Sequence, residues 1–432
     1  SEMSFHPAFM RVRLEDWING LNGDWLISRQ RFFGVPIPIW YPLNASGEPD
    51  YENPIVPSSE QLPVDPSSDC PDGFTEDQRG KPAGFIGELD IMDTWATSSL
   101  TPQLAGGWLS NPQLFEKVFP YDLRPQGQDI IRTWLFSTLV RSELEHDQVP
   151  WTNAAISGWI LDPDRKKMSK SKGNVVVPNE LLETHGSDAV RYWAASARLG
   201  TDAAFDEGQM KIGRRLAIKL LNAARFALSF DMPSGVTEVT EPIDKAMLAK
   251  LREVVGTASK AFENYDHTKA LETTETFFWT FTDDYLELVK ERAYSQEGYT
   301  AQEIGSAVLA LREALGVIVR LLAPFLPFAT EEVWSWWQEG SVHQAAWPSQ
   351  DELPEGSAEL LVAASEALIA IRKSKTDQKL SMKAEISIMV LQGPAVLSQA
   401  QRDLAAVGRI ADLNLEPADK VAISSMEFAE QQ

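Results

Sequence analysis

The stretch DRKKMSKSKGN at 164–174 has the clearest capacity for chemistry in this chain. It gathers five cations on one short segment: Arg165, Lys166, Lys167, Lys170 and Lys172. Between them, Ser169, Ser171 and Gly173 are small enough to let the backbone approach a ligand closely. Lysine ammonium groups suit phosphate oxygens, and Met168 can lie against an apolar surface such as a purine face. The segment therefore predicts a loop that meets a phosphorylated ligand, with a solvated basic turn as the plainer alternative.

A second candidate is Asp129, which follows Gly127 in DLRPQGQDIIRTW at 122–134. Periodic apolar residues predict a helix over 128–144, so the glycine and the acid stand at a helix start. Backbone N–H groups at such a start, together with a carboxylate, can bind a ribose diol. An aspartate that simply caps the helix would give the same pattern. Both interpretations of Asp129 stay open on this stretch alone.

Two tryptophans are candidates for the walls of an apolar pocket, Trp95 in ELDIMDTWATSS and Trp134 in the predicted helix. Paired tryptophans are more often core residues. Two basic patches are candidates for contact with a polyanion. The first holds Arg29 and Arg31, and the second is a set of cations on one predicted helix: Lys211, Arg214, Arg215 and Lys219. Each patch has a plainer interpretation as solvated surface.

Composition limits the class of protein. The chain has 432 residues, 44% hydrophobic and 23% charged, which indicates two or three globular domains rather than disorder. Its 39 Lys and Arg against 62 Asp and Glu give a net charge of −23, so any nucleic-acid contact must be local. With Cys70 as the one cysteine, an intramolecular disulfide and a structural zinc ribbon are excluded. No apolar run has the length of a membrane helix and no signal peptide is visible, so we expect a cytoplasmic protein.

The elements that must position these residues change along the chain. Short apolar runs at 35–41 and 153–161 predict strands that alternate with helices in an α/β layer, and 42–84 predicts a long loop. Between 206 and 348, long apolar periodicity predicts an antiparallel bundle of at least four helices. The residues after 348 predict a small α+β appendage. Its predicted elements are a helix over 358–373, a strand over 384–391 and a second helix over 395–408.

The order K-M-S-K-S resembles the second signature of the class I aminoacyl-tRNA synthetases. In that family the loop clamps the triphosphate of ATP while pyrophosphate leaves. The resemblance implies catalytic roles for Lys167 and Lys170, and ATP contacts for Met168, Ser169 and Ser171. Such roles are physically reasonable because phosphoryl-centre chemistry depends mostly on positioning and charge stabilisation.

The resemblance extends to the other candidates. It implies that Gly127 and Asp129 bind ATP, and that the amino-acid pocket is formed by Trp95, Trp134 and Gln126. The sequence DTWATSS, together with QGQDIIRTW, is most similar to the valyl branch of the family, particularly its archaeal-like form. This implies activation of valine with ATP and Mg²⁺, transfer to tRNA(Val) and no protein-bound zinc. An isoleucyl or leucyl relative, or a catalytically inactive tRNA-binding module, stays open as an alternative.

Several segments resemble RNA-binding parts of the same family. GDWLISRQRFFGVPIPIW at 23–40 resembles the stretch that follows the editing insert, which makes Arg29 and Arg31 candidates for contact with the tRNA acceptor end. NAARF at 222–226 and PFLPFATEEVW at 324–334 resemble the anticodon-binding bundle, which makes the cations on the predicted helix RNA candidates. The cation-rich run at 372–383 is a further candidate.

None of the five histidines forms a His-x-Gly-His arrangement, the first signature of the family. The resemblance therefore implies the C-terminal portion of a synthetase. It assigns 1–205 to the second half of a split Rossmann-type catalytic domain, 206–348 to the anticodon-binding domain and 349–432 to a small C-terminal α+β domain. In THGSDAVRYW, Ser187 or Asp188 is predicted to cap a helix. We expect a monomer that, as this chain alone, does not catalyse valine-dependent ATP–pyrophosphate exchange.

Overall fold

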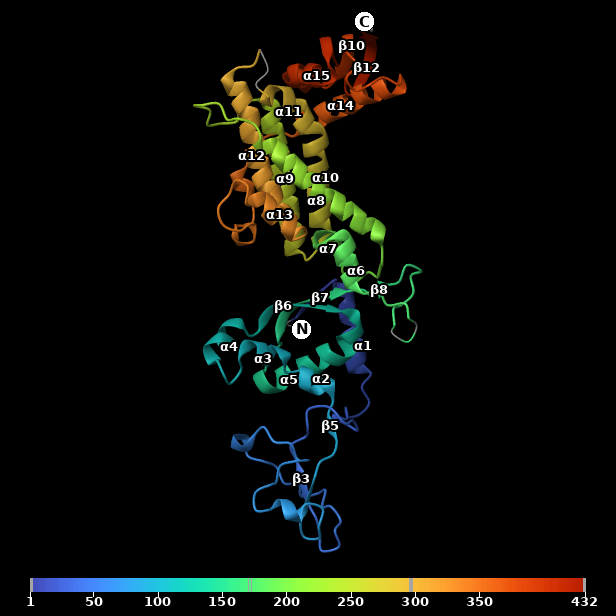
Figure 1. Ribbon diagram of the computed structural model, residues 1–432, viewed down its shortest axis with the longest axis vertical. Coiled ribbons are helices and arrows are strands. Elements are labelled where there is room, and N and C mark those ends of the chain that lie inside the picture. The colour runs from blue at the N-terminus through green and yellow to red at the C-terminus, as the bar shows by residue number, and fades with distance from the viewer. Residues whose placement is uncertain (1–2, 170, 172, 295–297, 430–432) are drawn as a thin grey trace. The chain divides into compact units, whose positions relative to one another are not determined.

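The computed structural model describes residues 3–169, 171, 173–294 and 298–429. The chain forms two compact units, each described by itself below (Figure 1). Unit 1 comprises Ser1–Trp159 and Leu199–Asp202, and unit 2 comprises Ile160–Arg198 and Ala203–Gln432. The predicted catalytic residue Lys170 lies outside the described residues.

The centre of unit 1 is a parallel three-stranded sheet in the order β1-β7-β6. Its strands are β1 (Ser4–His6), β7 (Trp151–Ser157) and β6 (Tyr121–Gly127). Parallel neighbours need a crossover, and a helical stretch after β6 supplies it. This stretch contains η4 (Gln128–Ile130), the π-helical turn η5 (Ile131–Leu135) and α5 (Phe136–His146). The predicted helix over 128–144 is thereby confirmed.

The core of unit 1 lies between the sheet, the crossover and α1 (Arg11–Asn19). Its buried side chains are apolar residues from all three: Phe5, Leu14, Ile131, Trp134, Leu135, Trp151 and Ile156. Further short helices complete this part of the unit: α2 (Thr94–Ser98), α3 (Thr101–Gly106) and α4 (Pro112–Val118).

The predicted loop at 42–84 is confirmed as a region of turns between short strands. Two antiparallel pairs frame it: β3 (Trp40–Pro42) with β4 (Phe85–Gly87), and β2 (Ser28–Arg29) with β5 (Ile91–Met92). Two 3₁₀ turns lie inside it, η2 (Ser59–Gln61) and η3 (Glu76–Gln78). The predicted strand over 35–41 is wrong for most of its length. Pro36 and Pro38 have no N–H to donate, which limits regular pairing to the last residues.

Unit 2 contains the predicted helix bundle. Long amphipathic helices bury one apolar face each in a single core. They are α8 (Glu207–Leu228), α9 (Pro242–Glu263), α10 (His267–Thr280), the π-helical turn η7 (Phe281–Tyr285), α11 (Leu286–Ala293), α12 (Ala301–Leu322) and α13 (Pro327–Trp334). Ahead of the bundle come β8 (Ile160–Leu161), α6 (Pro178–His185), α7 (Ser187–Ala195) and β9 (Ala203–Ala204), and β8 pairs with β9 in parallel.

The last part of unit 2 is the predicted α+β appendage. Its sheet has the order β11-β10-β12, with β10 parallel to β11 and antiparallel to β12. The elements are α14 (Glu359–Asp377), β10 (Ile386–Gly393), η10 (Ala395–Ala400), α15 (Gln401–Gly408), β11 (Ile410–Pro417) and β12 (Ala422–Phe428). The turns η8 (Val342–Gln344) and η9 (Gln350–Glu352) connect it to the bundle. Among the described residues, no helix is long and apolar enough to cross a bilayer.

Asp188 caps a helix, but not the one predicted from the sequence. The residue before α7 is Gly186, and no side chain caps this helix. The Asp188 carboxylate instead accepts hydrogen bonds from the backbone N–H groups of Phe328, at 3.1 Å, and Ala329, at 2.7 Å. These groups lie in the first turn of α13, where no intrahelical acceptor exists for them. Asp188 therefore joins α7 to the bundle through a cap that local spacing does not reveal.

We expect Asp188→Ala to lower the free energy of unfolding by about 1–2 kcal/mol, because it leaves two N–H donors at a helix start without their acceptor. Urea denaturation followed by far-UV circular dichroism measures the change. Ser187→Ala, at the neighbouring predicted cap, is the matched control and should change stability by less than about 0.5 kcal/mol. Equal effects of the two substitutions would contradict the capping role of Asp188.

Candidate nucleotide-binding site

The basic loop of unit 2 begins with a tight turn directly after β8. Asp162 N–H donates to the carbonyl of Lys166 at 2.9 Å, and Arg165 N–H donates to the carbonyl of Asp162 at 2.9 Å. The buried carboxylate of Asp162 also accepts from the Lys166 N–H at 2.7 Å. The acid thus fixes the entry to the loop.

Asn174 ties the far end of the loop to this turn. Its Nδ2 donates to Oδ2 of Asp162 at 2.8 Å and to the carbonyl of Lys167 at 3.3 Å. Its Oδ1 accepts from the N–H of Ser169 at 2.9 Å. The hydrogen bond from Asn174 and those from nearby backbone N–H groups lower the pKa of Asp162. The loop is therefore closed at its base by an amide–carboxylate pair that the sequence reasoning missed.

The predicted loop residues lie together above this base. Lys167 is exposed, and its backbone forms an isolated bridge with Leu161. Met168 and Ser169 are half-buried, while Ser171 is exposed, with its Oγ 3.3 Å from Oγ of Ser169. These four predicted residues follow one another closely in the chain, and their binding of ATP stays a prediction.

The predicted ribose-binding residues of unit 1 lie at the carboxyl end of β6. Gly127 ends this strand opposite Ser157, the last residue of β7. A Cβ on Gly127 would lie 3.5 Å from Oδ2 of Asp129 and 3.8 Å from Oγ of Ser157. Ligands of open α/β sheets bind at the carboxyl ends of parallel strands, so the position of Gly127 and exposed Asp129 fits a ligand site.

The same sheet edge is held by Gln128 and Asp202, which the sequence reasoning also missed. Gln128 Nε2 donates to Oδ1 of Asp202 at 3.1 Å, and the N–H of Trp159 donates to the same oxygen at 2.8 Å. A Cβ on Gly158 would lie 2.2 Å from the carbonyl oxygen of Thr201, so only glycine fits there. Among the described residues, buried Oε1 of Gln128 has no hydrogen-bond partner.

The three predicted pocket residues lie near one another in the core of unit 1. Trp134 is buried, with its ring 5.2 Å from that of Trp151 and the Arg124 guanidinium 3.7 Å above it. Trp95 packs against the same cluster and is partly buried. Gln126 is buried, and its Nε2 contacts the carbonyl of Gly127 at 3.3 Å. The core interpretation is confirmed for Trp134, whereas Trp95 lies partly buried beside that core. The role of both tryptophans as pocket walls stays a prediction.

Asp93 organises the segment that carries Arg29 and Trp95. Its buried carboxylate accepts hydrogen bonds from Nη2 of Arg29 at 2.6 Å, from Nε1 of Trp25 at 3.1 Å and from the N–H of Trp95 at 3.2 Å. The Arg29 guanidinium also donates to backbone carbonyls of its own segment. Arg29 therefore has an internal ion-pair partner, whereas Arg31 is exposed. Contact of either residue with RNA stays a prediction.

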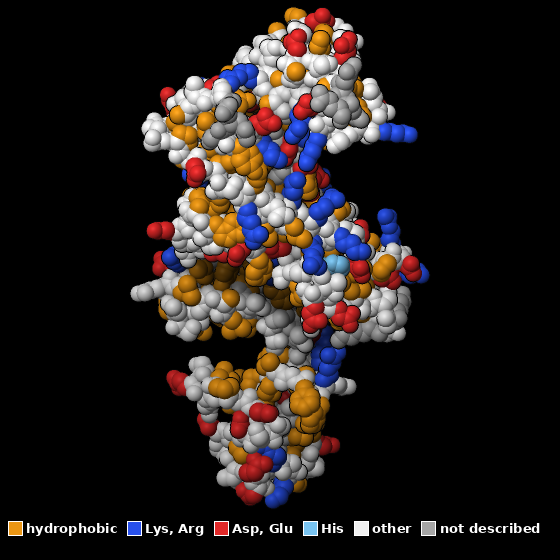
Figure 2. All heavy atoms as spheres, turned by 45° about the horizontal axis from the view of Figure 1, so that its top comes forward, with side chains coloured by type: hydrophobic (Ala, Val, Ile, Leu, Met, Phe, Trp, Pro, Cys, Tyr) orange, Lys and Arg blue, Asp and Glu red, His pale blue; other side chains and the backbone are white. Residues whose placement is uncertain are grey.

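The four predicted RNA-binding cations of unit 2 do share one helix, α8. Arg214 donates to the carbonyl of Thr184 at 2.6 Å, and Lys219 pairs with Asp283 at 2.8 Å. Arg215 lies over the ring of Trp279 at 5.6 Å, and Lys211 is exposed. Figure 2 shows Lys and Arg side chains gathered over the helical region, with hydrophobic side chains between them.

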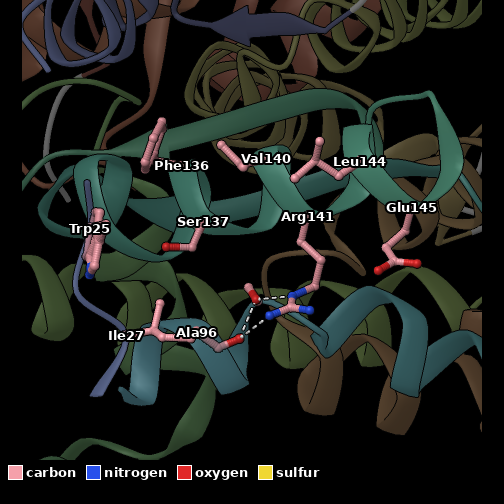
Figure 3. Close-up of a pocket in the computed structure, with 10 residues that line it drawn as sticks. Trp25, Ile27, Ala96, Phe136, Ser137, Val140, Arg141, Leu144 and Glu145 are labelled. Atoms are coloured by element: carbon pink, nitrogen blue, oxygen red, sulfur yellow. Dashed lines mark hydrogen bonds between the residues drawn. The ribbon is translucent and has the colours of Figure 1, made fainter. Parts of the chain in front are cut away.

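Unit 1 also contains an apolar pocket of about 240 Å³ that the sequence did not predict. Phe136, Val140 and Leu144 line it from α5, opposite Ile27 and Ala96 (Figure 3). Arg141 forms the polar edge of this pocket. Its guanidinium donates to the Ser99 hydroxyl at 2.7 Å and to the Ala96 carbonyl at 3.2 Å. Neither Trp95 nor Trp134 lines this pocket, so it is distinct from the predicted amino-acid pocket.

In the part of the chain that the structure describes, no three His, Cys, Asp or Glu side chains are grouped to hold a metal ion. The Cys70 thiol instead donates to Oε2 of Glu76 at 3.1 Å. Arg79 pairs with the same carboxylate, and together these hydrogen bonds lower the pKa of Glu76 to about 2. The cluster stabilises a turn of the 42–84 loop.

Two family models match this chain. Residues 1–206 match tRNA synthetases class I (I, L, M and V), and residues 244–390 match the anticodon-binding domain of tRNA ligase. Valine–tRNA ligase of Thermobifida fusca is 63% identical over 97% of this chain and 48% of its own length. The Leifsonia xyli valine–tRNA ligase is 60% identical over 98% of this chain and 50% of its own. The chain thus spans about half the length of the curated relatives it matches.

The fold is also similar to a solved structure. A LeuRS of Agrobacterium radiobacter K84, crystallised as a ternary complex with tRNA and LeuAMS, superposes with a TM-score of 0.56. The match covers 86% of this chain and 44% of the other at 21% sequence identity. At this identity the likeness concerns the fold alone.

Proposed function

We propose that the chain is part of a valine–tRNA ligase. Residues 1–206 match the class I tRNA synthetases of the I, L, M and V group, and residues 244–390 match the anticodon-binding domain of tRNA ligase, which supports this proposal. The observation that carries the proposal is the high identity to valine–tRNA ligases over nearly the whole chain. The proposal also states that the enzyme is of the archaeal-like form and is a cytoplasmic monomer. It places the domain boundaries near residues 205 and 348.

In the proposed reaction, a carboxylate oxygen of valine attacks the α-phosphorus of ATP. The bond from that phosphorus to the bridging oxygen breaks, and pyrophosphate leaves. A hydroxyl of tRNA(Val) then attacks the carbonyl carbon of valyl-adenylate, AMP leaves and the hydroxyl proton passes to solvent. No protein nucleophile is needed, so the protein contributes positioning and charge stabilisation.

Each part of the chain has a role in this proposal. Lys167 and Lys170 stabilise the charge on the leaving phosphates, while Gly127 and Asp129 hold the ribose at the sheet edge. The remaining loop residues, Met168, Ser169 and Ser171, line the ATP contact, and the amino-acid pocket is formed by Gln126, Trp95 and Trp134. The closed base of the loop supports these roles, because it holds backbone and cations on one small segment.

Amino-acid selectivity tests the proposal. The full-length protein should catalyse ATP–pyrophosphate exchange with valine far faster than with isoleucine or leucine, and should charge tRNA(Val). A pocket that is too small for one extra methylene discriminates by about 10–200-fold at this step. Preference for isoleucine or leucine would replace the valine assignment, and RNA binding without exchange would favour the inactive tRNA-binding module.

Asn174→Ala should slow valine-dependent exchange by about 10²-fold. It removes the hydrogen bonds to Asp162 and Ser169 that close the loop carrying the proposed phosphate-binding cations. Steady-state kinetics at varied ATP concentration measure the effect. Asn179→Ala, an exposed asparagine on α6, is the matched control and should be neutral. Unchanged kinetics in Asn174→Ala would contradict the anchoring role.

A further inference from the structure

The short helix α2 carries Trp95, one of the two tryptophans predicted to wall the amino-acid pocket. It has five residues, and none of them is fully buried. Isolated helices shorter than about 12–15 residues are marginal in water, so α2 cannot keep its place by its own hydrogen bonds. Contacts from other elements of unit 1 must therefore hold it.

The N-terminus of α2 is held by Asp93. Its carboxylate caps the helix by accepting from the N–H of Trp95, and it also binds the side chains of Trp25 and Arg29. The N–H of Asp93 donates to the carbonyl of Ile27 at 2.6 Å. The start of α2 is thus tied to the segment at 25–29.

The C-terminus of α2 is held by a side chain of α5. The last carbonyls of a helix have no intrahelical partner, and an arginine near the helix end can supply the missing donors. Figure 3 shows Arg141 reaching from α5 to Ala96, whose carbonyl accepts from its guanidinium at 3.2 Å. The guanidinium also donates to the buried hydroxyl of Ser99, which donates in turn to the same carbonyl at 2.5 Å. The three residues therefore form a closed set of hydrogen bonds.

A second donor from the same crossover reaches α2. Nε1 of Trp134 donates to the carbonyl of Ser98 at 2.9 Å. Trp134 is the other predicted pocket wall, and Trp95 packs against the core cluster that contains it. The two rings are thus connected through the backbone of α2, so a shift of α2 relative to α5 would change the space between them.

The structure leaves α2 room for such a shift. Ala96 and Ser99 border the apolar pocket of about 240 Å³, so this side of α2 faces a cavity instead of packed side chains. Interdigitated side chains normally fix the position of a helix. Here the Arg141 guanidinium spans the edge of the pocket, and the position of α2 depends on its hydrogen bonds.

We propose that Arg141 is a positioning residue for amino-acid selectivity, because it holds α2 against α5 and so fixes the separation of Trp95 and Trp134. The inference rests on the proposed function, in which these two rings are the walls of the valine pocket. Arg141 acts through Ala96 and Ser99 rather than by contact with the amino acid. A small pocket rejects a larger side chain only while its walls stay in place, so loss of this hold should admit isoleucine.

Arg141→Met tests the inference, because it keeps the apolar stem of the side chain and removes its donors. We measure ATP–pyrophosphate exchange by the full-length protein with valine and with isoleucine. The ratio of the two kcat/KM values, valine over isoleucine, should fall about tenfold, since one methylene in such a pocket is worth about 10–200-fold. KM for valine should rise, while KM for ATP should stay the same. Arg141→Lys should restore part of the ratio, because an ammonium group still offers a donor to Ala96.

Glu145→Gln is the matched control, because it removes a charge at the same pocket and leaves the hydrogen bonds to α2 in place. It should not change the ratio. Ser99→Ala removes one acceptor of the guanidinium and should lower the ratio about threefold, as expected for one hydrogen bond. Adding it to Arg141→Met should cause little further change, because both substitutions break the same contact. Ser99→Ala and Arg141→Lys carry the test if Arg141→Met does not fold.

The Trp95 ring provides a second measurement that needs no substrate. In protein labelled with fluorotryptophan, the fluorine NMR resonance of Trp95 is identified by its loss in Trp95→Phe. It should shift in Arg141→Met and stay in place in Glu145→Gln. An unchanged resonance in Arg141→Met would overturn the inference, and so would equal losses of exchange with both amino acids. A wild-type protein that does not activate valine would instead contradict the proposed function.

Discussion

Lys170→Ala in the full-length protein is expected to slow valine-dependent ATP–pyrophosphate exchange by about 10²–10³-fold and to leave tRNA affinity nearly unchanged. The alanine removes a cation proposed to stabilise charge on the leaving phosphates, and loss of one such donor typically has this magnitude. Because the interaction strengthens as pyrophosphate leaves, the loss should appear mainly in kcat. Exchange kinetics and a tRNA-binding titration on the same preparation measure the two quantities.

Lys166→Ala is the control for this substitution. Lys166 is an exposed cation of the same loop, 3.8 Å from Asp164, but lies outside the K-M-S-K-S order. Its loss should change exchange by less than about threefold, since a screened surface charge contributes little. Equal losses of exchange and tRNA affinity in Lys170→Ala would mean that the loop is structural or binds RNA.

The candidate site could be predicted from the sequence as far as its ligand-facing residues. The K-M-S-K-S order identified the loop, because those residues follow one another in the chain. Asp162 and Asn174, which close it, are twelve positions apart and act partly through backbone groups. Nothing in the local spacing distinguishes them from ordinary loop residues, so only the fold reveals the pair.

The fold was predictable where one segment carries its own pattern. The bundle helices α9 and α12 show a long apolar stripe, and β10, the central strand of its sheet, has an apolar run in which buried and more exposed residues largely alternate. The two strands beside it were missed. Both β11 and β12 lie at sheet edges and expose many of their residues, which weakens the alternating signal.

Cations show a different limit of sequence reasoning. Arg29 and Lys375 stand in polar segments that look solvent-exposed, yet each binds acceptors inside the protein. Arg292 is the strongest case, because it lies in a charged stretch of α11 and is only 2% exposed. Burial depends on what the rest of the chain places around a residue, and a charged residue type argues against it.

Arg292 joins three elements of unit 2 in a buried ion network. Its guanidinium makes two hydrogen bonds to Asp244 of α9, at 2.8 and 2.9 Å, and its Nε donates to Asp403 of α15 at 3.1 Å. Tyr285 and Ser306 also donate to the Asp244 carboxylate, at 2.9 and 2.6 Å. The appendage is thereby connected to the bundle through paired charges.

Arg292→Met should lower the free energy of unfolding of unit 2 by about 3–5 kcal/mol, because it leaves two buried carboxylates without their cation. At about 2–4 °C per kcal/mol, the melting temperature should fall by roughly 10 °C. Differential scanning calorimetry measures this change. Lys250→Met, which breaks an exposed pair with Glu253, should cost less than about 1 kcal/mol.

The deficit of Arg292→Met should shrink as the pH falls from 7.5 to 5.5. Burial already raises the pKa of Asp403 to about 6, against the attraction of Arg292, and removal of the guanidinium raises it further. A carboxyl group with a raised pKa in the folded state favours folding once it is protonated, so acid relieves the unpaired charge. Replacing the whole network by Arg292→Met, Asp244→Leu and Asp403→Leu should restore much of the stability. A triple variant as unstable as Arg292→Met at every pH would show that the arginine stabilises unit 2 by its packing rather than by neutralising the two acids.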